Sequence, residues 1–310
     1  MDFFSRTTHF DFMRWRHGAM AFSAVLTLTA LAFLTFRGLN LSVDYTGGTV
    51  IEVAYPEMVD LGPLRQALTA DGFEDAVVQH FGTPKEVLVR LAPRPGVAEK
   101  ELANRAVASL GKVGAGEPRL QRVEFVGPQV GEEITEQGGL AMLAAMIGIL
   151  IYVGLRFEWR LALGSVLALF HDTIIVLGFF SVTWMDFDLT AFAAILAVIG
   201  YSLNDTIVVY DRVRENFRKV RRGSSVEIMN LSLNETLSRT VMTGVTTLLV
   251  LMSLYLYGGE LLRSFTVALV VGVVFGIYSS VYVASALALA LGVSRADLMP
   301  AQKEGVDARP

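Results

Sequence analysis

Ionisable side chains inside long apolar stretches are the residues of this 310-residue chain best placed to do chemistry, because a charge in a membrane is costly. Asp205 follows Asn204 in one stretch, and Arg239 opens the next, followed by Thr240 and Thr243. A nearby arginine lowers the pKa of a carboxylate, whereas burial raises it. Separating such a pair would let the carboxylate take up a proton, as a proton-coupled cycle requires. The position favours this interpretation over a static ion pair that only fixes helix packing.

A second carboxylate, Asp172, lies beside His171 near the middle of another apolar stretch. It can belong to a proton path, but only the general cost of charges in membranes supports that hypothesis. Polar packing between helices is therefore the favoured interpretation of Asp172. Glu260 and Arg263 flank a short turn and are expected at the membrane interface.

Several other kinds of chemistry are excluded or disfavoured. The chain has no cysteine, which rules out disulfides, thiolate metal sites and cysteine nucleophiles. It has no phosphate-binding loop, no zinc-protease motif and no serine-hydrolase motif, so we expect no enzymatic activity, no cofactor and no metal. A net charge of −4 argues against general nucleic-acid binding. If the protein does work, the membrane gradient is the most available energy source.

The composition is that of a membrane protein, with 53% hydrophobic and only 18% charged residues against about 25% charged in soluble domains. A helical span needs about 20 mainly apolar residues. The first apolar stretch, residues 18–36, could instead be a cleaved signal peptide, with Ala30-Leu31-Ala32 as the cleavage site. Its length and the five further stretches favour a span. Six spans are predicted: 18–36, 139–156, 161–182, 189–210, 239–258 and 264–291.

Lysine and arginine are concentrated in alternate connections, which marks the cytoplasmic side of a membrane protein. The opposite short connections carry none at 183–188 and only Arg263 near the other. The sequence therefore predicts a multi-pass inner-membrane protein with both termini cytoplasmic. The basic residues on the predicted cytoplasmic side are Arg6, Arg14, Arg16, Arg156, Arg160, Arg212, Arg214, Arg218, Lys219, Arg221, Arg222, Arg295, Lys303 and Arg309.

The one long connection, residues 37–138, is predicted to be a folded extracytoplasmic domain. Strand-like alternation occurs at 49–55, 76–81, 86–91 and 121–125, with a turn at Gly82-Thr83-Pro84. Leucines at 61, 64 and 68 and apolar residues from 103 to 113 recur at helical spacing. The order βαββαβ is that of a ferredoxin-like α+β domain. The lone histidine there, His80, is expected to be structural or on the surface.

The predicted organisation has four parts: a cytoplasmic N-terminus with the first span (1–36), the domain (37–138), spans two to six (139–292) and a cytoplasmic tail (293–310). Small residues at Gly272, Gly276 and Ser280 predict close packing of the sixth span against a neighbour. A comparable face on the fourth span is formed by Ala193, Ala197, Gly200 and Asn204.

Four long motifs, in order along the chain, resemble the SecD/SecF family of the bacterial Sec protein-export machinery, which is related to the resistance-nodulation-division (RND) transporters. The third of them is similar to the SecF rather than the SecD branch. Val43 and Tyr45 are mild variants around the aspartate of the first. The motifs are Gly38-Leu-Asn-Leu-Ser-Val-Asp44-Tyr-Thr-Gly-Gly48-Thr, Val126-Gly-Pro-Gln-Val-Gly131, Gly200-Tyr-Ser-Leu-Asn-Asp205-Thr-Ile-Val-Val-Tyr-Asp211-Arg-Val-Arg-Glu-Asn216 and Leu233-Asn-Glu-Thr-Leu-Ser-Arg239-Thr.

This resemblance implies a six-helix RND-type half with an outer domain. It also implies a complex with SecD, beside the SecYEG channel, that uses the proton-motive force to help an unfolded exported polypeptide leave the membrane. Asp205 and Arg239 match the family's proton-path residues, with Asn204 and Thr243 as supporting positions. Gly47 and Gly48 are expected to shape the turn from membrane to domain.

Two other functions remain open. The first is a proton-driven small-molecule exporter of the same superfamily, although one domain of about 100 residues offers little room for a cavity of about 300–1,000 Å³. The second is a structural scaffold of the export channel, without proton coupling.

Overall fold

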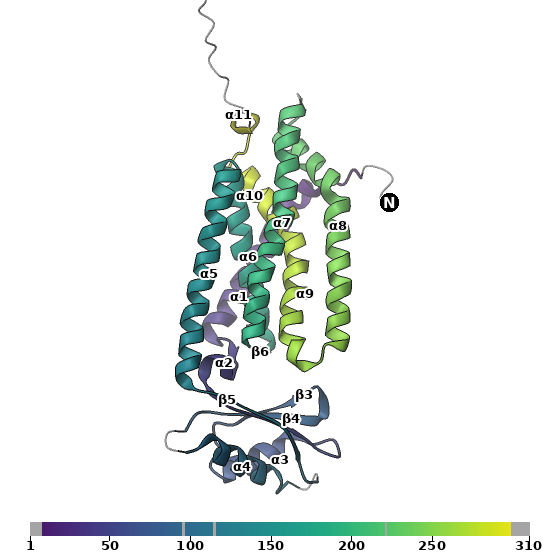
Figure 1. The fold of residues 1–310 in the computed structure, drawn as a ribbon. Helices are drawn as coiled ribbons and strands as arrows, with labels where there is room; N and C mark the ends of the chain where they lie inside the picture. Colours follow the sequence, from purple (N-terminus) through teal and green to yellow (C-terminus); the bar gives the residue numbers. More distant parts are fainter. Residues whose placement is uncertain (1–7, 95–96, 114–115, 221, 299–310) are drawn as a thin grey trace, which may run out of the picture.

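The computed structural model describes residues 8–94, 97–113, 116–220 and 222–298, so Arg6, Arg221, Lys303 and Arg309 of the basic segments lie outside the described residues. Six helices within it are long and apolar enough to cross a membrane, which confirms the six predicted spans. They form a bundle with an α+β domain at one end (Figure 1). The first five are α1 (Arg16–Phe36), α5 (Pro128–Arg156), α6 (Trp159–Thr183), α7 (Leu189–Lys219) and α8 (Ser225–Tyr257).

The sixth span is built from several helical segments. A 3₁₀ turn, η2 (Glu260–Leu262), leads into α9 (Arg263–Tyr278), a π-helical segment η3 (Ser279–Ala284) and α10 (Ser285–Ala290). A short helix, α11 (Arg295–Leu298), follows it. Before the first span lies another 3₁₀ turn, η1 (Phe12–Trp15). Both η1 and α11 lie toward the end of the bundle away from the domain (Figure 1).

Three spans extend further than the apolar stretches that predicted them. α5 begins at Pro128 instead of 139, α7 continues to Lys219 instead of 210, and α8 begins at Ser225 instead of 239. Hydropathy marks only the part of a helix that lipid covers, whereas capping groups mark its ends. At the start of α8, Ser224 and Glu227 form a reciprocal capping box, which moves the helix boundary well outside the apolar stretch.

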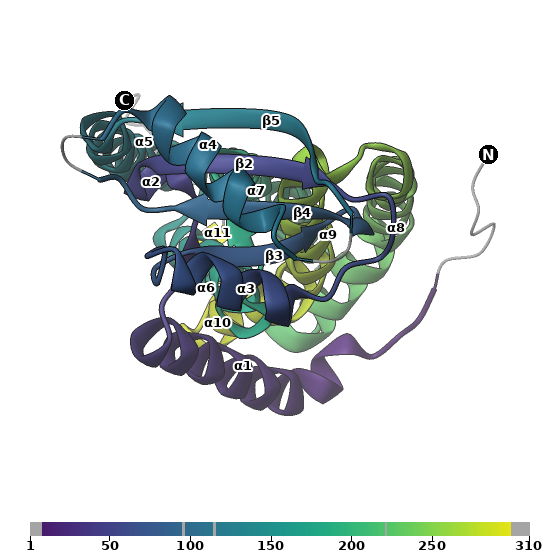
Figure 2. The same ribbon diagram turned by 90° about the horizontal axis from the view of Figure 1, so that it is seen from below.

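The domain is an antiparallel sheet with two helices on one face, in strand order β3-β4-β2-β5, which confirms the ferredoxin-like prediction (Figure 2). Ile51, Val53 and Tyr55 of the first predicted strand are buried in its core. The predicted turn shrinks to Gly82 alone, with φ +80°, because β4 already begins at Thr83. His80 is exposed. The elements are β2 (Gly48–Ala54), α3 (Leu61–Ala70), β3 (Val77–Phe81), β4 (Thr83–Leu91), α4 (Glu99–Leu110) and β5 (Arg119–Val126).

The two predicted small-residue faces differ in whether they pack against another helix. A Cβ on Gly272 would lie 2.2 Å from Val198 Cγ2, so α9 packs closely on α7, as predicted. By contrast, the comparable face on α7 makes no such contact within the described chain, and its members are exposed. That face is Ala193, Ala197, Gly200 and Asn204.

Candidate functional site

Asp205 lies inside the bundle on α7, with 8% of its surface exposed. Thr240 of α8 donates a hydrogen bond from Oγ1 to Asp205 Oδ1 at 2.8 Å. The other carboxylate oxygen, Oδ2, is buried and has no hydrogen-bond partner among the described residues. Buried polar atoms are rarely left without a partner, and those that are call for an explanation. A proton bound at Oδ2 is one way to relieve this oxygen.

The expected ion pair between Asp205 and Arg239 is not formed. Arg239 is exposed, and none of the ion pairs within the described residues joins it to Asp205. Its helical neighbour Thr240 faces the carboxylate instead, since consecutive helical residues point in different directions. Arg239 lines a groove with Val208 and Asp211 of α7.

The two supporting positions also lie on the outside. Asn204 is exposed on α7, and Thr243 is exposed on α8 with its hydroxyl 3.0 Å from the carbonyl oxygen of Arg239. Helical spacing places the small-residue face of α7 in line with Val208 and Asp211 of that groove. We call this surface the α7–α8 face; it comprises Ala193, Ala197, Gly200, Asn204, Val208, Arg239 and Thr243.

Asp172 lies among polar groups in the centre of the bundle. It is 1% exposed and accepts hydrogen bonds from Ser202 of α7 at 2.6 Å and Ser279 of η3 at 2.7 Å. His171 Nδ1 lies 3.0 Å from its other oxygen. Polar contacts between helices at Asp172 were the favoured prediction, and the structure contains them.

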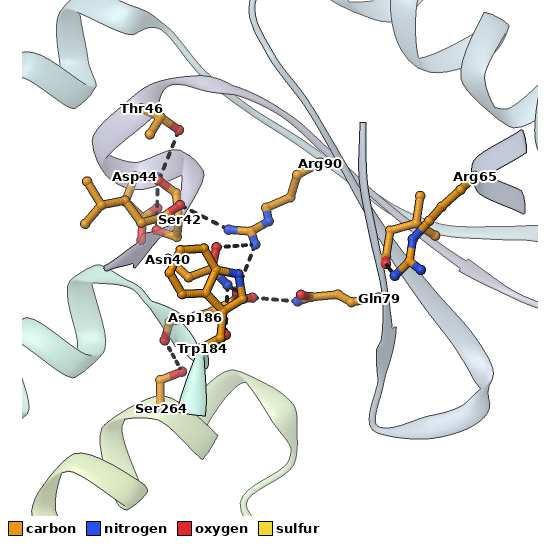
Figure 3. Close-up of polar contacts among 12 residues, drawn as sticks. Asn40, Ser42, Asp44, Thr46, Arg65, Gln79, Arg90, Trp184, Asp186 and Ser264 are labelled. Carbon is orange, nitrogen blue, oxygen red and sulfur yellow. Dashed lines mark hydrogen bonds and ion pairs between the residues drawn. The ribbon is translucent and has the colours of Figure 1, made fainter. Parts of the chain in front are cut away.

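The joint between domain and bundle is a polar network that the sequence did not predict (Figure 3). The short strands β1 (Asn40–Leu41) and β6 (Asp186–Phe187) pair in parallel. Arg90 of β4, whose side chain is 8% exposed, donates to Asn40 Oδ1 at 3.0 Å, to the carbonyl oxygen of Leu41 at 3.1 Å and to Asp186 Oδ1 at 2.9 Å. Gln79 of β3 donates to Asp186 Oδ2 at 2.6 Å.

Helix α2 (Val43–Thr46) connects this joint to α7. Asp44 accepts a hydrogen bond from the backbone N–H of Leu189, the first residue of α7, at 3.0 Å. A Cβ on Gly48, at φ +131°, would lie 2.4 Å from the carbonyl oxygen of Leu91, so only glycine fits this turn. The motif around Asp44 thus attaches the domain to the same helix that carries Asp205.

Carboxylates gather at this end of α7. Asp188 caps the helix by accepting from Ala191 N at 2.7 Å. Burial raises the pKa of Asp188 above its usual range, and the negative charges of Asp44 and Asp186 add to the rise. The capping hydrogen bonds act in the opposite direction.

A cleft of about 560 Å³ lies between the free face of the sheet and the bundle. This volume is within the range of about 300–1,000 Å³ for small-molecule sites, a size that the domain alone did not lead us to expect. The expectation considered the domain alone, whereas the space lies between domain and bundle. The ion pair Arg263–Glu260, at 2.8 Å, is among the charged groups that line the cleft.

At the other end of α7, side chains of the third motif make polar contacts that the sequence analysis did not predict. Both carboxylate oxygens of Asp211 accept hydrogen bonds from the guanidinium of Arg156 of α5, at 2.6 and 2.9 Å. Asn216 donates to Glu235 of α8 at 2.7 Å. For Asp211 the signal was present, because Asp211 lies seven positions after Asn204 and therefore on the same side of α7, whereas Asn216 lies on a buried side. The described residues contain no group of three or more His, Asp or Glu side chains placed to hold a metal ion.

Six spans with a ferredoxin-like domain between the first and second define a class of polytopic membrane protein. Residues 106–294 match the family described as protein export membrane protein SecD/SecF, C-terminal, and residues 32–55 match the SecD/SecF GG motif. The chain therefore belongs to the SecD/SecF family.

Several similar relatives within that family are SecF subunits. The chain is 51% identical to the protein translocase subunit SecF of Vibrio alginolyticus, over 96% of this chain and 95% of the relative. It is 49% identical to that of Pseudomonas aeruginosa, over 97% of each. The crystal structure of SecDF, a translocon-associated membrane protein from Thermus thermophilus, superposes with a TM-score of 0.82 and 38% identity over 92% of this chain. This chain spans only 39% of that longer one.

Proposed function

We propose that this chain is the SecF-type partner in a protein-export complex. Together with a SecD-type subunit, beside the SecYEG channel, it uses the proton-motive force to help exported polypeptides leave the inner membrane on the far side. The family membership and the similarity to a SecDF chain support this proposal. The observation that carries it is that Asp205 is buried and half satisfied, while Arg239 is exposed.

The α7–α8 face is the surface we propose for the SecD-type partner. Arg239 opens the apolar part of its span, where an exposed charge is costly, so Arg239 calls for cover by protein. The small residues Ala193, Ala197 and Gly200 allow a second backbone to approach closely. The partner would thus complete a polar site of which this chain supplies one half.

Within that site Asp205 is the group that takes up and releases the proton. Protonation at Oδ2 leaves the bond from Thr240 to Oδ1 in place, so the site accepts both states with little rearrangement. Arg239 favours the ionised form when it approaches and the protonated form when it withdraws. Because α7 is attached at its end to the domain through Asp44, a movement of α7 reaches the domain directly.

Asp205→Asn tests the proposal, because asparagine keeps an oxygen for Thr240 but cannot carry the proton. In membrane vesicles we expect the complex to assemble and the ATP-driven stage to proceed, while the stimulation of export by the proton-motive force is lost. Thr246→Val is the matched control, since the Thr246 hydroxyl bonds only to carbonyl oxygens of its own helix. Undiminished stimulation in Asp205→Asn would support the scaffold hypothesis, and proton flux driven by a small molecule would support the exporter.

The proposal also includes an orientation, with the α+β domain outside and both termini in the cytoplasm. The chain has no cysteine, so Met58→Cys on the exposed surface of the domain introduces the sole thiol. A membrane-impermeant thiol reagent should label it from outside in intact cells with a permeabilised outer membrane. Labelling only after the inner membrane is broken would reverse the orientation.

A further inference from the structure

The contacts of Asp172 join three spans through one carboxylate. Ser202 and Ser279 both donate to Oδ2, from α7 and η3, and His171 Nδ1 lies against Oδ1. A charge so deeply buried is costly unless its surroundings are built for it. Thr206 and Ser280, 2.8 Å apart, continue the polar contact between α7 and η3.

Ser279 has two acceptors for one hydrogen. Its Oγ lies 2.7 Å from Asp172 Oδ2 and 3.1 Å from the carbonyl oxygen of Gly276. It is also the first residue of the π-helical segment η3, and such segments occur frequently at functional sites. The direction of the Ser279 hydroxyl therefore depends on how strongly Asp172 attracts it.

His171 carries a buried atom that static packing does not explain. Its Nε2 has no hydrogen-bond partner among the described residues, and the residue is only 7% exposed. A histidine retained only to hold Asp172 in place would gain by satisfying both ring nitrogens. An unpartnered Nε2 is instead free to receive a proton.

We propose that His171 and Asp172 form a second proton-binding site, separate from Asp205, whose state sets the hydrogen bonding of Ser279 at the π-helical segment. An excess proton from the aqueous phase binds Nε2, and the Nδ1 proton passes to Asp172 Oδ1. The imidazole ends neutral with its hydrogen on Nε2, and the carboxyl ends neutral. Because charged acceptors form the stronger bonds, neutralising Asp172 releases Ser279 toward Gly276.

The other titratable groups around the site lie on the elements packed against α6. Tyr278 is in ring contact with His171, at 6.5 Å between centroids, and its hydroxyl donates to Ala19 O at 2.7 Å. The carboxylate of Asp205 is directed to α8 instead. Within the predicted spans these elements carry Tyr278 of α9, Tyr282 of η3, Tyr201, Asp205 and Tyr210 of α7, and Tyr152 and Arg156 of α5, while α1 and α10 carry none there.

The titration itself does not depend on the export role, but its place in a proton-coupled cycle rests on the proposed function. The full chain, co-purified with its partner and reconstituted in lipid vesicles, is examined by infrared spectroscopy as the pH is changed. We expect a carbonyl band of a protonated carboxyl that changes with pH, is absent in Asp172→Asn and persists in Asp205→Asn. Thr173→Val is the matched control and should retain the band, since the Thr173 hydroxyl bonds to Leu169 O of its own helix.

Two further variants test the route and protect against a folding defect. His171→Asn keeps a donor toward Asp172 but cannot relay a proton, so the band should appear more slowly after a pH jump. Ser279→Ala removes one bond to Oδ2 and should shift the Asp172 band in frequency without unfolding the bundle. A band that is missing, or constant at every pH in the wild type, would reduce Asp172 to static packing. Loss of stimulated export in Asp205→Asn, with the Asp172 band intact, would support the proposed function and the second proton-binding site independently.

Discussion

Replacing Arg90 by methionine should open the joint between the domain and the bundle. Methionine retains much of the apolar stem of arginine but removes the guanidinium. Three hydrogen bonds are lost, to Asn40, Leu41 and Asp186, including the ion pair that crosses from β4 to β6. The core of the domain does not depend on these contacts, because Arg90 is directed away from it toward the joint (Figure 3).

The expected cost follows from the partners that remain. Removing one member of a fully buried ion pair costs about 3–5 kcal/mol. Asp186 is 25% exposed and keeps the amide donors of Asn40 at 2.7 Å and Gln79 at 2.6 Å, so the cost is lower, about 2–3 kcal/mol. At 1.4 kcal/mol per factor of ten, the equilibrium for opening the joint rises about 30- to 150-fold.

Amide hydrogen exchange measures this opening directly. The backbone N–H of Ser42 donates to Phe187 O at 3.0 Å across the β1–β6 pair, so its exchange reports the joint. Exchange there should accelerate by the calculated factor, while amides of β2 and β4 keep their protection. Arg65→Met is the matched control, because Arg65 bonds to Val78 O within the domain.

Two results would refute this reasoning. Unchanged exchange at Ser42 would mean that the β1–β6 pair holds without Arg90. Equal acceleration in Arg65→Met would mean that any lost arginine loosens the domain and that the joint has no special dependence on the ion pair.

Two more predictions concern the attachment of α2 and α7. Asp188→Asn keeps the helix cap but removes an acid whose raised pKa makes the folded state bind its proton more tightly. The contribution of Asp188 to stability is present at low pH and lost as the pH rises from about 4 through the raised value, so the variant should lose less stability over that window. Parallel melting curves against pH would contradict this. Gly48→Ala should destabilise the domain by at least about 1–3 kcal/mol in thermal unfolding, because of its φ of +131° and the contact with Leu91 O. Gly72→Ala, at φ +86° with open space around it, is the control and should cost less; equal losses would dismiss the steric argument.

Hydropathy and alternation were sufficient for the spans and the ferredoxin-like domain, because both patterns reflect burial along a regular element. The extension of α5 back to Pro128 was missed because the residues there are largely polar, so hydropathy gives no signal of a span. The β1–β6 pair was missed because two residues are too short for a periodic pattern. The π-helical segment at Ser279 depends on hydrogen-bond geometry, which no residue type signals on its own.

The candidate site was predicted in its members but not in its geometry. Depth along the helices placed Asp205 and Arg239 at a similar level, but depth says nothing of rotation about a helix axis. Helical phase could have shown that Asp205 faces inward, since its neighbour Asn204 continues the exposed face of Ala193, Ala197 and Gly200. Sequence reasoning paired the acid with the base, whereas the acid faces Thr240 and the base faces outward.

The pairing of β1 with β6 has a consequence for biogenesis. Asn40 and Asp186 are separated by 146 positions in the chain, and two spans, α5 and α6, are synthesised between them. All strands of the four-stranded sheet are synthesised before α6 begins, so the domain can acquire its core early. Its docking on the bundle can be completed only once β6, in the loop after α6, has been synthesised. Maturation should therefore pass through a stage with a folded but undocked domain, open to quality-control proteases at the linker around Ser42.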